Sequence, residues 1–456
     1  MSQQLIIQAL DALLPDSDHP QHAEIEVDIG SGKITAIRAG VREMALEPSL
    51  GSETLKLKKG LVLLPGLLDC HVHLNQPGRT SWEGFQTGTS AAVSGGITAL
   101  VDMPLNSIPP TTTLANLRVK QAEARDVGVC CDVGFWGGIV PGNSKELLPL
   151  LDAGVKGFKC FLINSGVEEF PHVCEEDLIE ACEALANTNA LILFHAELEG
   201  HDLEPSPPYE PSHYSSFLHS RPQSLELAAL DLVLKLARIY PRIRFHIVHL
   251  STAAALPVIK EARGEGIANL SVETCFHYLC LRAEDIAPNA TQFKCCPPIR
   301  NEANRMKLCS ALMDGLIDFV VSDHSPCTPE LKKGDFLTSW GGVSGLGLGL
   351  SLLWTEMGQE AGLGRIVRWM GSRQAEQVGL EGKKGVIAVG ADADFVVFDP
   401  SAQFVVTEAT LMFKNKVSPY LGRTLRGIVQ KTFLRGRLVW DANSGQQPYA
   451  SQGQLM

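Results

Sequence analysis

The sequence lacks the features by which proteins bind nucleic acids or membranes. Its formal net charge is −12 and it contains no long basic run, which disfavours nucleic acids and anionic lipid surfaces as partners. No apolar stretch approaches the roughly 20 residues that span a bilayer, and the strongest candidate, LVLLPGLL, is short and interrupted by Pro65. We therefore expect no nucleic acid and no membrane as a partner, and a small molecule as the substrate or ligand.

Targeting signals and a disulfide framework are also missing. The N-terminus has no basic segment ahead of its apolar stretch, so it does not resemble a secretory signal, and the final GQLM is not a peroxisomal Ser-Lys-Leu signal. The 12 cysteines include no pair with CxxC spacing, which is typical of reduced and mostly buried thiols. These observations predict a cytoplasmic or other reducing compartment.

What the sequence does contain is a regular alternation of strand and helix patterns from residue 61 to residue 384. Short apolar runs rich in β-branched residues alternate with segments whose apolar residues recur every three to four positions. Because parallel strands need crossover helices, eight such units in series predict an α/β fold of the (β/α)8 or TIM-barrel type. A doubly wound open sheet is the competing arrangement. In chain order the apolar runs are LVLLPGLLDCHVH, GITALVDMP, CCDVGFWGGIV, VKGFKCFL, ALILFHAE, RIRFHIVHL, ANLSVETCFHY and IDFVVSDHSP.

The two ends of the chain have a different pattern. Residues 24–40 form two alternating runs joined by Gly-Ser-Gly, which is typical of a β-hairpin, and residues 427–440 repeat the order of strand, turn and strand. A chain of 456 residues also exceeds the roughly 250–300 at which one hydrophobic core stops growing. We predict that residues 1–60 and 385–456 pair into a small β-sandwich domain beside a barrel of residues 61–384.

Ionisable residues occur where the predicted barrel strands end, which is where barrel enzymes carry their chemistry. The first strand ends in His71 and His73, which share one side because side chains alternate along a strand. His246 and His249 lie three positions apart and point to opposite sides, and His249 is nearer the strand end. The complete set of ionisable strand ends is His71, His73, Lys159, His195, His249 and Asp323.

Taken singly, these residues have ordinary explanations. A lysine in an apolar run often extends its ammonium group to solvent, and an aspartate before a Ser-Pro turn is often a local cap. The coincidence of so many ionisable strand ends at one rim instead predicts a metal centre. His277, near the end of the seventh strand, is a candidate for a supporting or substrate-side role, and His324 should face away from the metals.

Four imidazoles and one carboxylate exceed what a single catalytic zinc ion needs. Two divalent ions would share them, provided that an anionic group bridges the pair. Burial lowers the pKa of a lysine, and the neutral amine of Lys159 can then add carbon dioxide and become an anionic carbamate. We expect zinc as the first choice of metal, although manganese, cobalt and iron accept the same ligands.

The motifs resemble those of the cyclic amidohydrolases, the group that includes hydantoinases, dihydropyrimidinases, dihydroorotases and allantoinases. They are GLVLLPGLLDCHVHLNQPGR, GFKCF, HIVHLS, CCPPIR, FVVSDHSPCTPE and the HxE at residues 195–197. Within this group the chain is most similar to the allantoinases, in WEGFQTGTSAAVSGGITALVDMPLNSIPPTT, in SDHSPCTPELKKGDFLTSWGGVSGL and in KVSPYLGRTLRGIVQKTFLRG. The likeness covers nearly all of the chain from residue 60 onward.

The resemblance implies a role for each strand-end residue. His71 and His73 would bind one metal with Asp323, His195 and His249 would bind the other, and Lys159 would be the carbamylated bridge. A bridging hydroxide would attack the ring amide carbonyl, while Asp323 takes the proton and returns it to the departing nitrogen. The substrate would be allantoin, the product allantoate in purine breakdown, and the assembly a homotetramer.

Differences from the other cyclic amidohydrolases narrow the choice of substrate. Hydantoinase-like relatives carry a tyrosine shortly after the bridging lysine, and this chain has none at residues 160–164. Dihydroorotases place an arginine directly after HxH, where this chain has Asn75. Hydantoinase, dihydropyrimidinase and dihydroorotase activities are therefore the weaker alternatives, and a non-enzymatic scaffold is disfavoured because every expected ligand is present. The candidate substrate contacts are Arg79, Asn106, Cys296 and Gly341.

Overall fold

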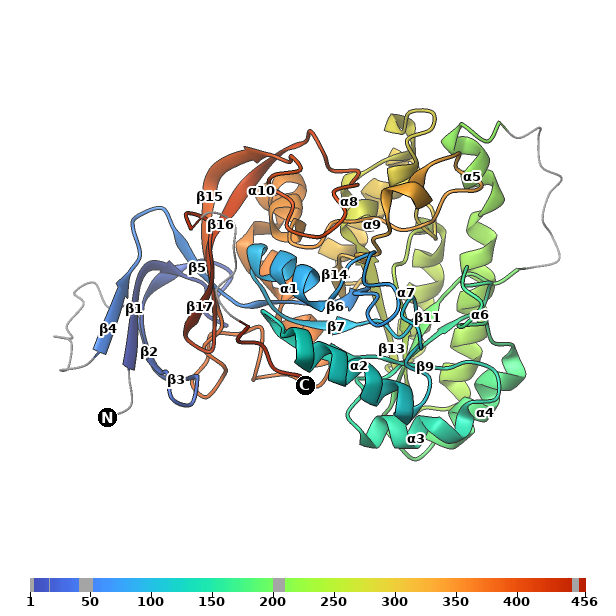
Figure 1. Cartoon of the computed structure of the whole chain (residues 1–456), viewed down its shortest axis with the longest axis horizontal. Coiled ribbons are helices and arrows are strands. Elements are labelled where there is room, and N and C mark those ends of the chain that lie inside the picture. The colour runs from blue at the N-terminus through green and yellow to red at the C-terminus, as the bar shows by residue number, and fades with distance from the viewer. Residues whose placement is uncertain (1–3, 16, 41–51, 200–209, 445–450) are drawn as a thin grey trace.

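Eight parallel strand positions form a closed barrel in the computed structural model, which describes residues 4–15, 17–40, 52–199, 210–444 and 451–456 (Figure 1). The third position is split, because β8 pairs with β7 whereas β9 pairs with β10. The ring closes where Val72, at the end of β6, bridges His324 after β14. The barrel strands are β6 (Leu67–Val72), β7 (Ile97–Asp102), β8 (Asp132–Phe135), β9 (Gly137–Gly138), β10 (Phe158–Phe161), β11 (Leu191–His195), β12 (Arg244–Ile247), β13 (Leu270–Cys275) and β14 (Phe319–Val321). The predicted TIM-barrel fold is confirmed.

The barrel strands are apolar because helices cover their outer faces. Every residue of β6, β7, β10 and β11 is buried, as expected for parallel strands that have no solvent-facing side. Within the described residues the helices are α1 (Phe85–Ser94), α2 (Leu114–Val127), α3 (Ser144–Asp152), α4 (Glu175–Leu185), α5 (Tyr214–Ser220), α6 (Gln223–Ile239), α7 (Leu256–Gly264), α8 (Phe276–Cys280), α9 (Glu302–Met313), α10 (Gly349–Met370) and α11 (Ser372–Gln377). No helix in these parts of the chain is both long and apolar enough to cross a membrane.

Local sequence signals explain where the helices begin and end. The Thr113 side chain accepts a hydrogen bond from the backbone N–H of Asn116, which satisfies a donor in the first turn of α2. Gly128 follows that helix with φ of 75°, a conformation that glycine adopts at little cost. In α6 the apolar residues recur every three to four positions and therefore share one face. Ala229, Val233 and Leu236 on this face are buried against the barrel.

A second sheet combines strands from both ends of the chain (Figure 1, left). Its order is β17-β16-β15-β5-β1-β2-β3, with β4 paired to β1. Its strands are β1 (Gln4–Ala12), β2 (Gln21–Asp28), β3 (Lys33–Ala39), β4 (Ser52–Lys56), β5 (Val62–Pro65), β15 (Phe395–Val405), β16 (Thr424–Leu434) and β17 (Arg437–Asp441). Both predicted hairpins occur, as β2–β3 and β16–β17.

This composite sheet has its own hydrophobic core, to which both halves contribute. Ile7 and Ile25 from the N-terminal strands lie in one cluster with Phe395 and Phe433 from the C-terminal strands. The strands form one continuous sheet, and both of its halves contribute to that core. The part of residues 1–60 within 41–51 lies outside the described residues.

The first predicted barrel strand is divided between the two sheets. Val62–Pro65 pairs antiparallel with β15 in the composite sheet, and only the chain from Leu67 onward joins the barrel. Between them, a side chain at Gly66 would place its Cβ 2.3 Å from Thr98 Oγ1, so the crossing requires glycine. Residues 62–65, which we expected in the barrel, therefore belong to the composite sheet.

Buried ion pairs connect the two sheets. The Lys384 ammonium lies 2.7 Å from Asp132 at the start of β8, and 2.9 and 2.7 Å from Asp392 and Asp394, just before β15. The C-terminal residues join the same region, because Val133 N–H donates to the Gln454 carbonyl. Such a shared cation fixes the barrel base against the composite sheet.

Candidate metal centre

The six predicted ligands line one cavity of about 530 Å³ at the carboxyl ends of the barrel strands. They lie at or just beyond the ends of buried strands, and their side chains line the opening of the barrel. His71 belongs to β6, Lys159 to β10 and His195 to β11, and all three side chains are buried. His73 follows β6 directly, and His249 and Asp323 lie just beyond the ends of β12 and β14, each separated from its strand by one residue.

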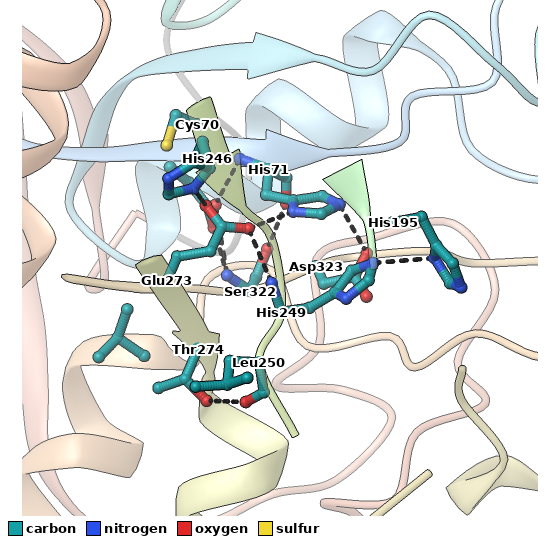
Figure 2. Close-up of polar contacts among 12 residues, drawn as sticks. Cys70, His71, His195, His246, His249, Leu250, Glu273, Thr274, Ser322 and Asp323 are labelled. Atoms are coloured by element: carbon teal, nitrogen blue, oxygen red, sulfur yellow. Dashed lines mark hydrogen bonds and ion pairs between the residues drawn. The ribbon is translucent and has the colours of Figure 1, made fainter. Parts of the chain in front are cut away.

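The imidazoles face one another in two groups. Nε2 of His71 and Nε2 of His73 lie 3.2 and 3.5 Å from the same oxygen of Asp323, Oδ1. Nδ1 of His195 lies 3.1 Å from Nε2 of His249 (Figure 2). His71, His249 and Asp323 each offer a ligand atom within 4.8 Å of the others. This spacing suits nitrogen and oxygen donors around divalent ions.

Burial disfavours the protonated form of three of the imidazoles, and metal binding requires the neutral form. Desolvation lowers the pKa of His195 to about 4 and lowers the pKa of His73 and of His249 as well. Burial alone would raise the pKa of Asp323, but the facing rings of His71 and His73 hold it below its usual range. The centre thus has an ionised carboxylate beside His73, His195 and His249, whose protonated forms burial disfavours.

Lys159 is buried, and its Nζ has no hydrogen-bond partner among the described residues. Burial lowers its pKa to about 8, although the carboxylates of Asp323 and Glu273 oppose this change. The amine lies 5.1 Å from the centroid of the Phe161 ring rather than in an ion pair. Burial makes the neutral form of this amine accessible, and side chains that can bind metal surround it. These surroundings suit a lysine carbamate, whose oxygens could ligate a metal ion.

Two of the six residues have unusual backbone conformations. His249 and Asp323 have φ of 43° and 41°, in the left-handed region that non-glycine residues seldom occupy. Such conformations cost on the order of 1–3 kcal/mol and persist where the surrounding structure fixes them, which is common at functional sites. Both residues turn away from their strands at the point where their side chains enter the cavity.

Two buried carboxylates that the sequence interpretation did not assign hold the histidine rings. Glu273 on β13 accepts hydrogen bonds from His71 Nδ1 at 2.5 Å and from His246 Nε2 at 3.0 Å (Figure 2). Glu197 accepts from His195 Nε2 at 2.8 Å and from Arg221 Nη1 at 2.5 Å. The second ring nitrogens of His71 and His195 are then directed toward the centre. Carboxylates outside a metal site orient its histidines in this way.

Three other buried histidines of the described chain, His246, His277 and His324, lie outside the two groups. Both ring nitrogens of His246 are hydrogen-bonded, one to Ser271 and one to Glu273. This agrees with the prediction that His249, and not His246, is the ligand. His324 Nε2 lies 3.3 Å from Glu83, and its Nδ1 accepts from the Gly345 backbone N–H, so its ring has partners away from the centre. His277 is fully buried, and neither ring nitrogen has a partner among the described residues.

Three of the four predicted substrate contacts line the cavity, and the fourth does not. Asn106, Cys296 and Gly341 line the cavity, and the Asn106 amide also lies 3.3 Å from His73 Nδ1. Arg79 does not line it: its guanidinium pairs with Glu169 and lies 5.0 Å from the centroid of the Trp82 ring. These partners hold Arg79 in its loop, and contact of Arg79 with substrate stays a prediction.

Several cavity residues were missed because they come from long loops rather than strand ends. Arg221 lies just before α6, Lys294 follows a 3-10 turn, and Ser339 and Trp340 lie on the loop after β14. Only the WGG motif around Gly341 gave a signal in the sequence. The cavity wall opposite the strand ends therefore carries cations and side-chain donors that periodicity does not reveal.

A parallel barrel with imidazoles, a lysine and a carboxylate at its strand ends is the arrangement of a metal-dependent hydrolase. The model of the amidohydrolase family matches residues 62–439, and the chain belongs to that family. Within the family it belongs to the allantoinases. It is 52% identical to allantoinase of Saccharomyces cerevisiae over 86% of this chain and 85% of that protein. It is 47% identical to allantoinase of Streptomyces avermitilis over 96% and 95%.

Solved structures of related enzymes have the same fold. L-hydantoinase from Arthrobacter aurescens matches with a TM-score of 0.87 and 27% identity, over 100% of this chain and 99% of that one. Dihydropyrimidinase from Brevibacillus agri matches with a TM-score of 0.84 and 26% identity, over 100% and 98%. The chain is accordingly a hydrolase with the amidohydrolase barrel.

Proposed function

We propose that this protein hydrolyses allantoin to allantoate, which opens the hydantoin ring by cleaving one cyclic amide. The observation that carries the proposal is the cavity in which two groups of imidazoles, one carboxylate and an unpaired buried lysine converge. The substrate follows from the relatives, which are named allantoinases in yeast and Streptomyces and cover most of both chains.

The residues fit two divalent metal ions, with zinc as the first choice. His71, His73 and Asp323 would hold one ion, and His195 and His249 the other. Lys159 would lie between them as a carbamate, formed when the lone pair of the neutral Nζ bonds to the carbon of carbon dioxide and one proton is released. The ligand atoms of His71, His249 and Asp323 already lie within 4.8 Å of one another.

When bound, the ions polarise the ring carbonyl and make the attacking water more acidic. The protein's own part is proton transfer and orientation. Asp323 accepts a proton from the water and returns it to the ring nitrogen as the C–N bond breaks, so that water adds across the amide. Glu273 and Glu197 keep the rings of His71 and His195 in place during the reaction.

Local residues favour allantoin over the substrates of related branches. Phe161 stacks on His195 with ring centroids 4.4 Å apart, in a segment where hydantoinase-like relatives carry a tyrosine. Asn75 donates to the Pro326 carbonyl at 3.3 Å, at the position where dihydroorotases place an arginine. These differences leave hydantoinase and dihydroorotase activities as the weaker alternatives.

We further propose a homotetramer in a cytoplasmic or other reducing compartment. The compartment is supported by the cysteines, all of which are free thiols and most of which are buried. The assembly follows only from the resemblance to cyclic amidohydrolases, and the molar mass in solution by light scattering tests it.

One experiment tests the function directly. The protein loaded with zinc is assayed side by side with allantoin, hydantoin, dihydrouracil and dihydroorotate, and the ureido acid formed is measured. We expect the highest kcat/KM with allantoin, loss of activity after chelation, and recovery when zinc is returned. A metal-free preparation with full activity, or faster turnover of another ring, would overturn the proposal.

A further inference from the structure

One wall of the cavity is made of two loop segments, residues 294–296 before α9 and residues 337–342 after β14. The ammonium group of Lys332 holds the second segment. Its Nζ donates to the Trp340 carbonyl at 2.9 Å and to the Gly342 carbonyl at 2.6 Å. Lys332 does not line the cavity itself, so its contacts are with the wall and not with the space inside.

Lys332 and a second lysine also join the two segments to each other. Lys332 Nζ donates to the Lys294 carbonyl at 3.3 Å, and the same carbonyl accepts from the Gly342 N–H at 2.8 Å. In the opposite direction, Lys294 Nζ donates to the Ser339 carbonyl at 2.5 Å. A wall that is fixed in this way before a ligand arrives loses little entropy when the ligand binds.

The position of Lys332 is unusual for a charged side chain. It is buried, and no carboxylate of the described residues forms an ion pair with it. A buried charge is costly unless polar groups satisfy it, and here main-chain carbonyls do so. Loss of the ammonium group would leave those carbonyls without their donor, which also costs free energy. The loop conformation therefore depends on this one side chain.

The two carbonyls that Lys332 holds lie on either side of Gly341. The N–H groups of Trp340 and Gly342 are also hydrogen-bonded within the protein. In contrast, neither the N–H nor the carbonyl of Gly341 has a hydrogen-bond partner among the described residues. Gly341 is half-buried, and because it has no side chain it lines the cavity with main-chain atoms. The main chain is thus anchored before and after Gly341 and left open at Gly341.

A free N–H and a free carbonyl together complement an amide group, which offers one acceptor and one donor. A cyclic amide substrate carries such groups. We propose that Lys332 is a positioning residue, which fixes the main chain of Gly341 for contact with the substrate by holding the residues on both sides of it. This assignment rests on the proposed hydrolysis of allantoin and deepens it, since it identifies what holds a predicted contact that has no side chain.

The test is a double-mutant cycle on KM. Lys332→Met keeps the length of the side chain and removes its donors. Gly341→Ala disturbs the predicted contact itself, because the new Cβ lies 3.2 Å from Cys296 Sγ. KM and kcat for allantoin, zinc content and melting temperature are measured for the wild type, the two single variants and the double variant.

We expect Lys332→Met to raise KM for allantoin about tenfold. The kcat and the zinc content should stay near those of the wild type, because the lost interaction serves binding and not the metal centre. In the Gly341→Ala background the same substitution should raise KM much less, since the contact is already disturbed. Lys332→Gln keeps N–H donors and should raise KM less than Lys332→Met. It takes the place of Lys332→Met in the cycle if that variant does not fold.

The matched control is Lys416→Met. Lys416 Nζ also donates to main-chain carbonyls, those of Leu411 and Phe413, but Lys416 does not line the cavity or hold its wall. The control should lower the melting temperature and leave KM unchanged. It therefore shows the effect of losing a lysine that only stabilises a loop.

An unchanged KM in a folded Lys332 variant would overturn the assignment. The same fold increase in both backgrounds would overturn it as well, because Lys332 would then act without Gly341. A rise in KM of equal size in Lys416→Met would also count against it. A wild-type enzyme that does not hydrolyse allantoin contradicts the proposed function itself, whereas the other outcomes, obtained with an active wild type, concern Lys332 alone.

Discussion

Glu273 Oε1 lies 2.5 Å from Nδ1 of His71, while Nε2 of the same ring lies 3.2 Å from Asp323. The imidazole is held from one side by Glu273 and directed at the Asp323 carboxylate on the other. Burial would raise the pKa of Glu273, but the rings of His71 and His246 lower it to about 2. An ionised carboxylate in this position fixes both the orientation of the ring and the nitrogen that carries the proton.

Replacing that carboxylate should weaken metal binding. We expect Glu273→Gln to lower the affinity for zinc about 10–100-fold, measured by competition with a chromogenic chelator. Glu226→Gln is a matched control, because Glu226 is also buried but pairs with Arg300 at 2.6 Å instead of a histidine of the centre. That control should lower the melting temperature and leave the affinity unchanged. Equal affinity in Glu273→Gln and the wild type would refute the orienting role.

Removing the amine of Lys159 should remove the bridge. We expect Lys159→Ala to bind fewer than two ions and to lose turnover, and added short carboxylic acids such as acetate to restore part of both. Metal content by elemental analysis, with and without acetate, checks this expectation. Two tightly bound ions in Lys159→Ala without any added acid would contradict the carbamate.

Asp323 should be required for proton transfer. We expect Asp323→Asn to lower kcat at least about 10³-fold, within the range that general acid–base groups contribute, with the fold retained by circular dichroism. Because Asp323 is also a predicted ligand, metal content is measured on the same sample. Substantial turnover in the variant would remove its acid–base role.

The stability of the metal-free protein should depend on pH through Lys159. Burial lowers its pKa from 10.5 to about 8, so between these values the unfolded chain binds a proton that the folded chain does not. Stability therefore rises with pH across this window. We expect metal-free Lys159→Met to melt above the wild type at pH 7, with a difference that shrinks as the pH approaches 10. A constant difference would indicate that folding does not shift the pKa of Lys159.

The barrel could be predicted from the sequence, and candidate ligands could be named, because both leave a local signal. Buried parallel strands produce continuous apolar runs, and an ionisable residue at the end of such a run stands out, as Lys159 does in GFKCF. Glu273 lies inside a strand, and its partner His71 is on another, so only the arrangement of strands connects them. The break at Gly66 was hidden within one apolar run, since its cause is the close approach of Thr98. The pairing of Arg79 with Glu169 left no signal in the sequence, because the two residues are far apart along the chain.

The pairing of β5 with β15 has a consequence for synthesis of the chain. Leu64 lies opposite Val396, so a strand that emerges early from the ribosome lacks its neighbour until almost the whole protein has been translated. Until then one edge of β5 is open, and open edges of apolar strands template aggregation. Products of premature termination before β15 should therefore precipitate rather than persist as free barrels, and the N-terminal strands reach their final order only when translation is nearly complete.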